Sequence, residues 1–215
     1  VAGGGGRAEV VFLAGTRVML GCSWPGRGAL WPMGIPRLRL PGGSPSRAAL
    51  KLEEAFCQLL TPRERRTRLT SGRTAVDLGA APGGWSLVLL QDGLNVTAVD
   101  RAALSGVVTG YKGLRHVRED GFRFRPAKPV DWLFCDMVEQ PGRIADLVGH
   151  WAVSGWCRGA LFNLKLPMKK RLAELTHCQE RILSTMEKAG IPCRLRFRHL
   201  YHDREEVTGL LLVAS

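Results

Sequence analysis

The stretch best suited to chemistry is a loop of small residues that follows an apolar run, Asp77-Leu78-Gly79-Ala80-Ala81-Pro82-Gly83-Gly84-Trp85. Small residues let the backbone approach a ligand closely, and the helix expected to begin at Gly84 offers free N–H groups in its first turn. The loop therefore predicts a nucleotide-like cofactor. A nicotinamide or flavin enzyme would carry the spacing G-x-G-x-x-G here, and this loop lacks it.

Three acidic residues follow predicted strands in register with that loop. Asp77 ends the first strand, where a carboxylate suits an ammonium or sulfonium ligand better than a phosphate. Asp100 ends the second strand, about 20 residues beyond the first glycine, where a carboxylate binds ribose hydroxyls. Asp120 follows the third and can accept a hydrogen bond from an adenine amino group. A single acid at a strand end is usually a helix cap or surface charge, but the three together predict S-adenosylmethionine.

Alternating strand and helix signals must position these residues. Strands are predicted over residues 74–78, 95–99, 115–118, 130–135, 159–164, 193–199 and 206–213, and helices over 84–91, 143–152 and 170–189. A further helix, capped by Ser46, is expected to run through Lys51 to Leu60. The pattern predicts an α/β fold: a mostly parallel seven-stranded sheet with helices on both faces. No helix separates the last two strands, so we expect them to pair antiparallel.

The N-terminal part differs in composition. Residues 8–13 and 17–22 are apolar runs around a short turn and predict a hairpin within a segment 1–31. Residues 32–45 are rich in proline and glycine and predict a linker, which leaves 46–215 as the main domain. A lone hairpin is only marginally stable, so it is expected to belong to a larger sheet. The start at Val1, without Met and on a glycine tract, suggests a piece of a longer protein.

Composition limits the class of protein. The 215 residues carry a net charge of +12, which suits a polyanionic partner such as RNA, although a GC-rich genome also enriches arginine. No apolar run is long enough for a membrane span, and no signal peptide is visible. The six cysteines form no C-x-x-C pair, so no zinc site is predicted. We expect a cytoplasmic protein without a metal, and a monomer.

Five motifs together resemble the FtsJ-type ribose 2′-O-methyltransferases. They are the loop Asp77 to Trp85, Ser46-Arg47-Ala48-Ala49-Leu50-Lys51-Leu52, Cys135-Asp136-Met137, Asn163-Leu164-Lys165 and Arg204-Glu205-Glu206-Val207. The resemblance implies a class I, Rossmann-like methyltransferase fold. It also implies a set of cofactor contacts, namely Asp77, Gly79, Ala81, Pro82, Gly83, Gly84, Trp85, Asp100, Asp120 and Asp136.

The same resemblance implies a catalytic set of Lys51, Asp136, Lys165 and Glu206. Glu205 rivals Glu206, and because side chains alternate along a strand only one of them can face the site. A ribose hydroxyl is too weak an acid to ionise at neutral pH, so a lysine must accept its proton or stabilise the alkoxide. We assign this role to Lys165, with Lys51 as the neighbouring cation and the acids fixing both ammonium groups.

A closer resemblance exists to members of this family that methylate a cytidine of bacterial 23S ribosomal RNA. It is carried by Arg118-Glu119-Asp120-Gly121-Phe122, by residues 33–38, by Phe162 to Arg171 and by Leu200 to Thr208. It implies 23S rRNA as the partner, a cytidine in the peptidyl-transferase region as the target, and N-terminal THUMP-type RNA-binding domains of which residues 1–31 would be the last hairpin.

Alternative functions are disfavoured by single features. An amino-methyltransferase would carry an N/D-P-P-Y/F turn where this chain has Asp136-Met137-Val138-Glu139. A carbon-5 pyrimidine methyltransferase needs a reactive cysteine, and alternation points Cys135 away from the face that Asp136 uses. A non-catalytic RNA-binding module with a vestigial cofactor pocket would not need all four catalytic residue types. Methylation of another RNA or position stays open.

Overall fold

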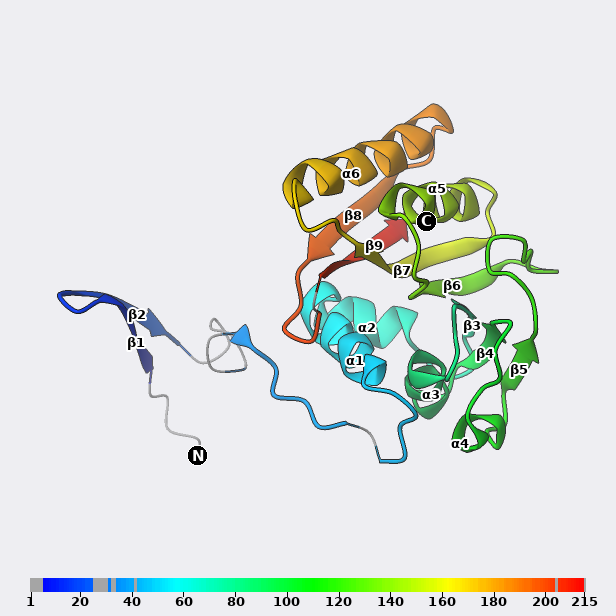
Figure 1. Ribbon diagram of the computed structural model, residues 1–215, viewed down its shortest axis with the longest axis horizontal. Helices are drawn as coiled ribbons and strands as arrows, with labels where there is room; N and C mark the ends of the chain where they lie inside the picture. Colours follow the sequence, from blue (N-terminus) through cyan, green and yellow to red (C-terminus); the bar gives the residue numbers. More distant parts are fainter. Residues whose placement is uncertain (1–5, 25–30, 32–33, 41, 204, 215) are drawn as a thin grey trace. The chain divides into compact units, whose positions relative to one another are not determined.

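The computed structural model describes residues 6–24, 31, 34–40, 42–203 and 205–214 (Figure 1). The chain divides into two compact units, Val1–Arg37 and Leu38–Ser215. The boundary between them falls within the segment 32–45 that composition marks as a linker. In the first unit, β1 (Arg7–Ala14) and β2 (Arg17–Ser23) pair antiparallel from Arg7 opposite Ser23, which confirms the predicted hairpin. Its apolar side chains are exposed, Phe12 by 79%.

The second unit is built on a seven-stranded sheet in the order β5-β4-β3-β6-β7-β9-β8. Its strands are β3 (Thr74–Leu78), β4 (Asn95–Val99), β5 (Leu114–Val117), β6 (Val130–Cys135), β7 (Cys157–Lys165), β8 (Cys193–Arg198) and β9 (Glu206–Val213). The pairs from β5 to β7 are parallel, and β9 runs antiparallel to both of its neighbours. The mostly parallel sheet with an antiparallel last strand is therefore confirmed.

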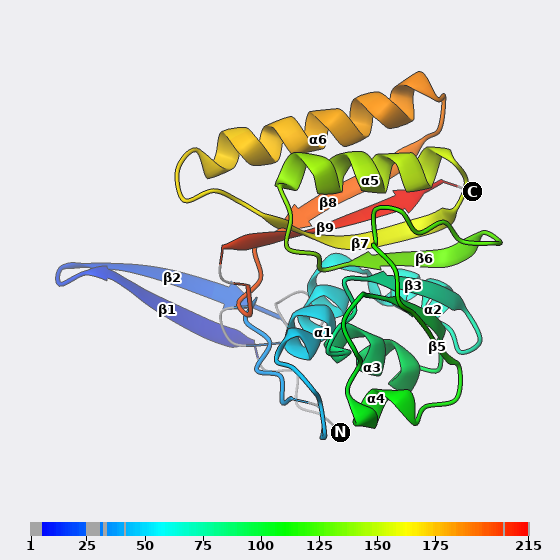
Figure 2. The same cartoon turned by 45° about the vertical axis from the view of Figure 1, so that its right-hand side comes forward.

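Helices cover both faces of this sheet (Figure 2). One face carries α1 (Ala48–Leu59), α2 (Pro62–Arg68), α3 (Gly84–Gln91) and the short α4 (Gly106–Thr109), and the other carries α5 (Pro141–Val153) and α6 (Arg171–Lys188). Two helices were not predicted, α2 and α4. The signal for α2 was present, because Thr61 and Glu64 form a capping box around Pro62 at the helix start.

The start of α1 also differs from the prediction. Arg47, not Ser46, is the N-cap residue, and Ser46 lies one position further out. The Ser46 hydroxyl still accepts a hydrogen bond from the Ala48 N–H, at 3.2 Å. Ser46 therefore stabilises the turn that leads into the helix instead of capping the helix itself.

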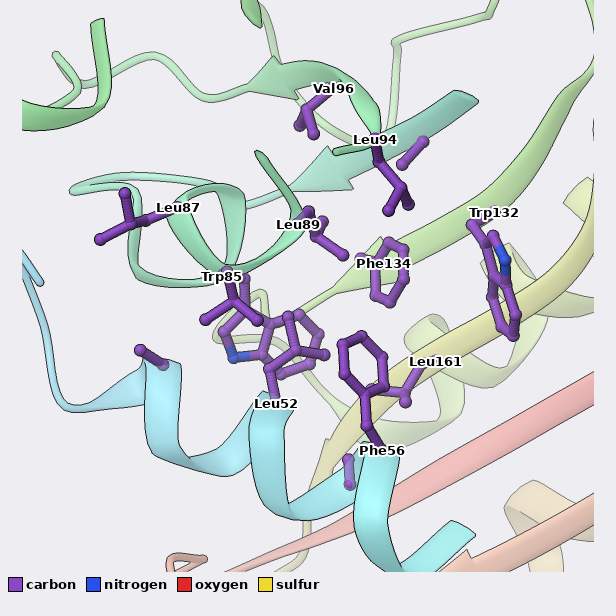
Figure 3. Packing of buried hydrophobic residues seen from close by; sticks show 14 of the residues in the cluster. Leu52, Phe56, Trp85, Leu87, Leu89, Leu94, Val96, Trp132, Phe134 and Leu161 are labelled. Carbon is purple, nitrogen blue, oxygen red and sulfur yellow. The ribbon is translucent and has the colours of Figure 1, made fainter. Parts of the chain in front are cut away.

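Aromatic packing fixes α1 and α3 on the sheet (Figure 3). The ring of Phe134, from β6, meets Phe56 edge-on at 6.1 Å and Trp85 edge-on at 6.3 Å between ring centroids. Trp132 stacks on it from the same strand at 5.6 Å. Burying each large apolar side chain contributes about 2 kcal/mol, so this cluster holds α1, with Lys51, rigidly against the sheet. None of the helices in the described residues is both long and apolar enough to cross a membrane.

Candidate active site

Asp77 ends β3 inside the protein, with 1% of its surface exposed. Its Oδ2 accepts a hydrogen bond from the Ser86 hydroxyl of α3 at 2.6 Å, whereas Oδ1 is buried without a partner among the described residues. Burial, with the negative charges of Asp136 and Asp100, raises the pKa of Asp77 to about 7, although the hydrogen bond from Ser86 acts to lower it. The charged form of Asp77 is therefore not stabilised by a cation, and Oδ1 has no hydrogen-bond donor, among the described residues.

A cavity of about 400 Å³ opens at the carboxyl ends of β3, β4 and β6. Its lining includes five of the residues predicted to bind the cofactor, Gly79, Ala81, Asp100, Asp120 and Asp136. Asp100 holds the cavity wall together, because its Oδ2 accepts the Ala81 N–H at 3.0 Å and its Oδ1 accepts the Ala102 N–H at 2.8 Å. Each carboxylate oxygen has a second lone pair, so Asp100 can still accept hydroxyl donors.

Asp120 stands at the cavity wall contributed by the segment after β5. Its Oδ1 accepts the Phe122 N–H at 2.8 Å, which closes a turn through its own backbone, and its Oδ2 is paired with Arg101. As with Asp100, the backbone fixes the direction of the carboxylate. The acids on the cavity wall thus serve the local turns and also present oxygen atoms to whatever fills the cavity.

The rest of the small-residue loop does not line this cavity. Pro82, Gly83, Gly84 and Trp85 lie beyond it, and a Cβ on Gly83, at φ +110°, would come within 2.7 Å of Val108 in α4. Trp85 is 3% exposed, and its indole N–H donates to the Ala48 carbonyl at 3.0 Å. Gly83 and Gly84 therefore allow other segments of the chain, and not a ligand, to pack closely against the loop. Trp85 joins α3 to α1.

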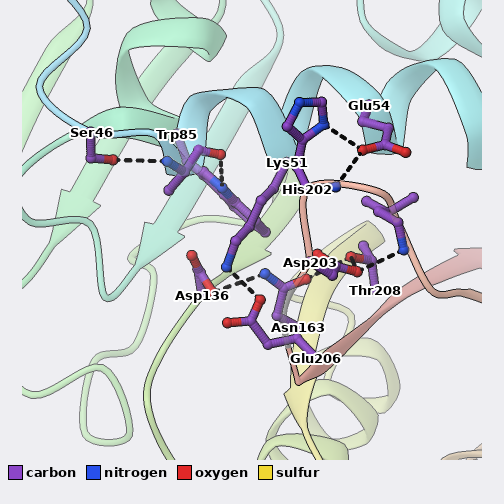
Figure 4. A network of polar contacts seen from close by, with 12 residues as sticks. Ser46, Lys51, Glu54, Trp85, Asp136, Asn163, His202, Asp203, Glu206 and Thr208 are labelled. Atoms are coloured by element: carbon purple, nitrogen blue, oxygen red, sulfur yellow. Dashed lines mark hydrogen bonds and ion pairs between the residues drawn. The ribbon is translucent and has the colours of Figure 1, made fainter. Parts of the chain in front are cut away.

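Four side chains from distant parts of the chain gather beside the cavity, and we call them the lysine–carboxylate cluster: Lys51, Asp136, Lys165 and Glu206. Figure 4 shows Lys51, Asp136 and Glu206. Lys51 of α1 forms an ion pair with Glu206. Lys165, the last residue of β7, lies opposite Glu206 in the β7–β9 register. Burial raises the pKa of Asp136, while the charges of Lys51 and Lys165 lower it.

A buried chain of hydrogen bonds holds Asp136 from behind. Asn163 is fully buried and donates its Nδ2–H to Asp136 Oδ1 at 2.9 Å. Its Oδ1 accepts from the Thr208 hydroxyl at 2.8 Å, and that hydroxyl also lies 3.2 Å from Asp203 Oδ2. The hydroxyl hydrogen is either shared between the two acceptors or donated to Asn163 while a protonated Asp203 donates to the hydroxyl oxygen. Burial raises the pKa of Asp203 to about 6.

Glu54 connects α1 to the loop that precedes β9. It is 2% exposed and accepts the backbone N–H groups of Tyr201 at 2.8 Å and His202 at 3.0 Å. His202 Nδ1 lies 2.6 Å from the same carboxylate and carries the hydrogen, since a carboxylate only accepts. Sequence reasoning did not assign Glu54, Thr208 or Asp203 to the site. Asp203 and Thr208 lie in the stretch Leu200 to Thr208 that carries the closer resemblance, but their contacts, like those of Glu54, depend on the fold.

Three further expectations concern neighbours of the cluster. Glu206 points into the cluster and Glu205 is exposed, which decides between the two in favour of Glu206. Cys135 is fully buried, and burial raises the pKa of its thiol to about 12, as expected for an inert cysteine. Arg204, part of the last motif, lies outside the described residues.

The residues present fit S-adenosylmethionine. Asp100 and Asp136 lie close enough for their negative charges to raise the pKa of Asp77, and Asp77 Oδ1 is a buried acceptor with no donor in the described part of the chain. The cofactor carries a sulfonium and an ammonium group, and cations of this kind would relieve that repulsion. The cavity wall adds carboxylates suited to ribose hydroxyls and an adenine amino group.

Comparison with known proteins shows which family the chain belongs to. Residues 45–172 match the model of the FtsJ-like methyltransferase family. This chain belongs to that family. The finding confirms what the motifs predicted. Among curated relatives of this FtsJ-like chain, the ribosomal RNA large subunit methyltransferase M of Alkalilimnicola ehrlichii is 54% identical over 207 residues. The match covers 96% of this chain but only 56% of that protein, so the chain spans little more than half of its relative.

Solved structures agree on the fold. The fibrillarin pre-rRNA processing protein of Methanococcus jannaschii superimposes with a TM-score of 0.57 at 14% identity, over 76% of this chain and 74% of that one. Aeropyrum pernix fibrillarin, crystallised with natively bound S-adenosyl-L-methionine, gives a TM-score of 0.53 at 17% identity, over 95% of this chain and 94% of that one. At such identities the likeness supports the Rossmann-like methyltransferase fold of this FtsJ-like chain and nothing finer.

Proposed function

We propose that this FtsJ-like chain is the catalytic part of an S-adenosylmethionine-dependent enzyme that methylates the ribose 2′-hydroxyl of a cytidine in the peptidyl-transferase region of 23S rRNA. The observation that carries the proposal is the convergence of Lys51, Asp136, Lys165 and Glu206 beside an acid-lined cavity. The curated relatives are named for ribosomal RNA methylation, and the nucleotide follows from the closer resemblance of the motifs. The enzyme would act in the cytoplasm as a monomer, and the hairpin would complete an RNA-binding domain.

The cofactor would supply an electrophilic methyl group at the mouth of the cavity. Asp77 would face its cationic part, directly or through a water molecule, and Asp100 would accept its ribose hydroxyls. Asp120 would accept a hydrogen bond from the adenine amino group. Ala81 presents only a methyl group to the cavity wall, and the missing Cβ of Gly79 makes room for Met137, which lines the same cavity. These contacts bind and orient the methyl donor.

The chemistry at the hydroxyl would be carried by the lysine–carboxylate cluster. Lys165 would take the proton of the 2′-hydroxyl or stabilise the alkoxide as the oxygen attacks. Lys51, fixed by its ion pair with Glu206, would keep a positive charge beside that oxygen. Asp136, fixed by Asn163, would hold the two ammonium groups in position. Alignment of the two reacting groups would supply a large part of the rate.

Two measurements on the same protein test the proposal. Isothermal titration calorimetry should show one S-adenosylmethionine bound per chain. Mapping of 2′-O-methylation on 23S rRNA should show one cytidine that loses its methyl group when the gene is deleted and regains it with the intact gene. Cofactor binding without a lost methyl group would favour another RNA substrate. If the titration shows no binding, the enzymatic function is wrong and a non-catalytic RNA-binding module with a vestigial pocket is favoured.

A further inference from the structure

Two loops form the rim of the site on the side away from the cofactor cavity. The first rim loop, residues 166–170, leads from Lys165 at the end of β7 to α6. The second rim loop, residues 199–203, leads from β8 towards β9. The Leu166 N–H donates to the Glu205 carbonyl at 3.0 Å, and β9 lies between β7 and β8 in the sheet. The first rim loop continues into α6, whereas the second is bound to Glu54 of α1, so the two loops flank the lysine–carboxylate cluster from the two faces of the sheet (Figure 2).

The end of the first rim loop and the first residue of α6 carry three consecutive cations that form no ion pair with any residue the structure describes. Lys169, Lys170 and Arg171 are all exposed. The ammonium groups of Lys169 and Lys170 have no ion pair within the described residues, and Arg171 donates only to the Pro167 carbonyl, at 3.3 Å. The nearby acids are Glu205, which is exposed, and Glu174, which is half-buried in the first turn of α6, so the three cations outnumber them and the rim keeps a net positive charge.

Lys170 occupies an unfavourable backbone conformation. Its φ is +59°, and every other positive φ in the described residues belongs to a glycine. The left-handed conformation places Cβ too close to the following carbonyl, a cost that glycine avoids. Strained positions of this kind cluster at ligand-binding sites, and Lys170 lies five residues after Lys165.

The second rim loop presents an aromatic ring on a fixed backbone. Tyr201 is 67% exposed, although its N–H is bound to the buried Glu54 at 2.8 Å. The Tyr201 and His202 rings are perpendicular, with 5.2 Å between centroids, and the exposure of Tyr201 leaves much of its ring accessible. An aromatic ring held in this way can stack on an unpaired nucleobase. Bases inside a duplex are already stacked on their neighbours and are not accessible to such a ring.

We infer that the two rim loops hold a single-stranded segment of the RNA substrate across the active site. Backbone phosphates lie on Lys169, Lys170 and Arg171, and one base next to the reacting nucleotide stacks on Tyr201. This inference rests on the proposed function and adds to it that the target is presented unpaired.

The charge contacts are tested with the full chain and a single-stranded RNA oligonucleotide, by fluorescence anisotropy over a range of salt concentrations. The double variant Lys169→Ser, Lys170→Gly should weaken binding and lower the slope of log Kd against log salt by about 1.4, or about 0.7 for each phosphate that is no longer neutralised. Lys188→Ser is the control, because it removes an exposed charge at the far end of α6, about 26 Å away. An unchanged slope in the double variant would overturn the phosphate contacts.

The single variant Lys170→Gly separates lost binding from lost folding. It relieves the strained backbone at this position, so it should raise Tm while it lowers RNA affinity. Tyr201→Ala should weaken single-strand binding about tenfold and leave binding to the matching duplex unchanged, and Tyr201→Phe should bind like wild type. Equal affinity of Tyr201→Ala and wild type for the single strand would overturn the stacking contact. Cofactor titration of the same preparations is independent of RNA, so failure of the proposed function is detected separately.

Discussion

The cofactor cavity and the lysine–carboxylate cluster share Asp136, but the chain builds them in different ways. In the cavity, Asp100 and Asp120 are held by backbone N–H groups two residues further along, Ala102 and Phe122. In the cluster, the members come from α1, the end of β6, the end of β7 and the start of β9, and side chains hold them. A hydrogen bond to the backbone survives most substitutions of its neighbours, whereas one substitution removes a bond between two side chains.

This difference implies different sensitivities. The cavity should tolerate substitutions around its acids, because the turns that aim them depend on backbone groups. The cluster should fail when one member is removed, and should also fail when a buried partner behind it is changed conservatively. Four substitutions, ordered by expected effect, separate the two regions.

The largest effect is expected for Lys165→Ala. Removal of the group that handles the hydroxyl proton should lower the rate of methyl transfer about 10³-fold, within the range typical of general acid–base catalysis. Lys165 is not among the residues that line the cofactor cavity, so cofactor affinity should stay within about twofold of wild type. Single-turnover transfer of a labelled methyl group to RNA and calorimetry with S-adenosylmethionine check the two halves. Near-normal turnover would show that another residue accepts the proton.

Thr208→Val tests the support behind the cluster. The substitution keeps the shape of the side chain but removes the hydroxyl that bonds Asn163, so Asp136 loses its fixed orientation. We expect kcat to fall about 10- to 100-fold, the equivalent of one buried hydrogen bond of about 1.4 to 3 kcal/mol, with little change in KM. Thr208→Ser restores the hydroxyl and should restore most of kcat. A valine variant that folds and turns over normally would show that the chain of hydrogen bonds serves stability alone.

The features that depend on neighbouring residues could be predicted from the sequence, and those that depend on distant segments could not. The bounds of β3, β4, β6, β9 and α3 agree with the predicted ranges, because apolar runs and turn residues are local signals. The cluster members could be named from residue types in motifs, but their mutual contacts depend on β9 lying between β7 and β8. Glu54 carried no signal, since an acid that binds a distant backbone looks like any surface acid. Asp203 lies in the stretch that carries the closer resemblance, but its residue type does not show that it contacts Thr208. Contacts between residues that are distant in the sequence could not be predicted before the strand order was known.

Asp77→Asn tests the buried acid next to the cavity. The Asp77 pKa is raised to about 7, so the wild-type carboxylate gains its charge between pH 6 and pH 8. A cationic cofactor binds the charged form, and its affinity should therefore rise about tenfold over that range. The asparagine variant should bind weakly and without this pH dependence. Calorimetry at both pH values checks the sign, and a wild-type affinity that falls with rising pH would contradict it.

The same variant has a consequence for stability. The folded-state pKa lies above the usual value of 3.8, so the folded protein holds a proton that the unfolded chain has released, and stability falls as pH rises from about 4 to 7. Without cofactor, Asp77→Asn should therefore have a higher Tm than wild type at pH 8, and the advantage should shrink towards pH 5. A lower Tm of the variant at pH 8 would show that the buried charge is already compensated.

The smallest functional effect is expected for Trp85→Phe. The resemblance places Trp85 among the cofactor contacts, whereas its ring is buried and its N–H bonds the Ala48 carbonyl of α1. Loss of this bond should lower the free energy of unfolding by about 1–3 kcal/mol and leave cofactor affinity within about twofold. Trp132→Phe is the matched control, because its N–H bonds the Arg68 carbonyl at 2.7 Å, away from the cavity. If both variants lose similar stability but only Trp85→Phe loses cofactor affinity, Trp85 contacts the cofactor. If neither variant loses cofactor affinity, Trp85 joins α3 to α1 and contributes to the site only by holding Lys51 in place.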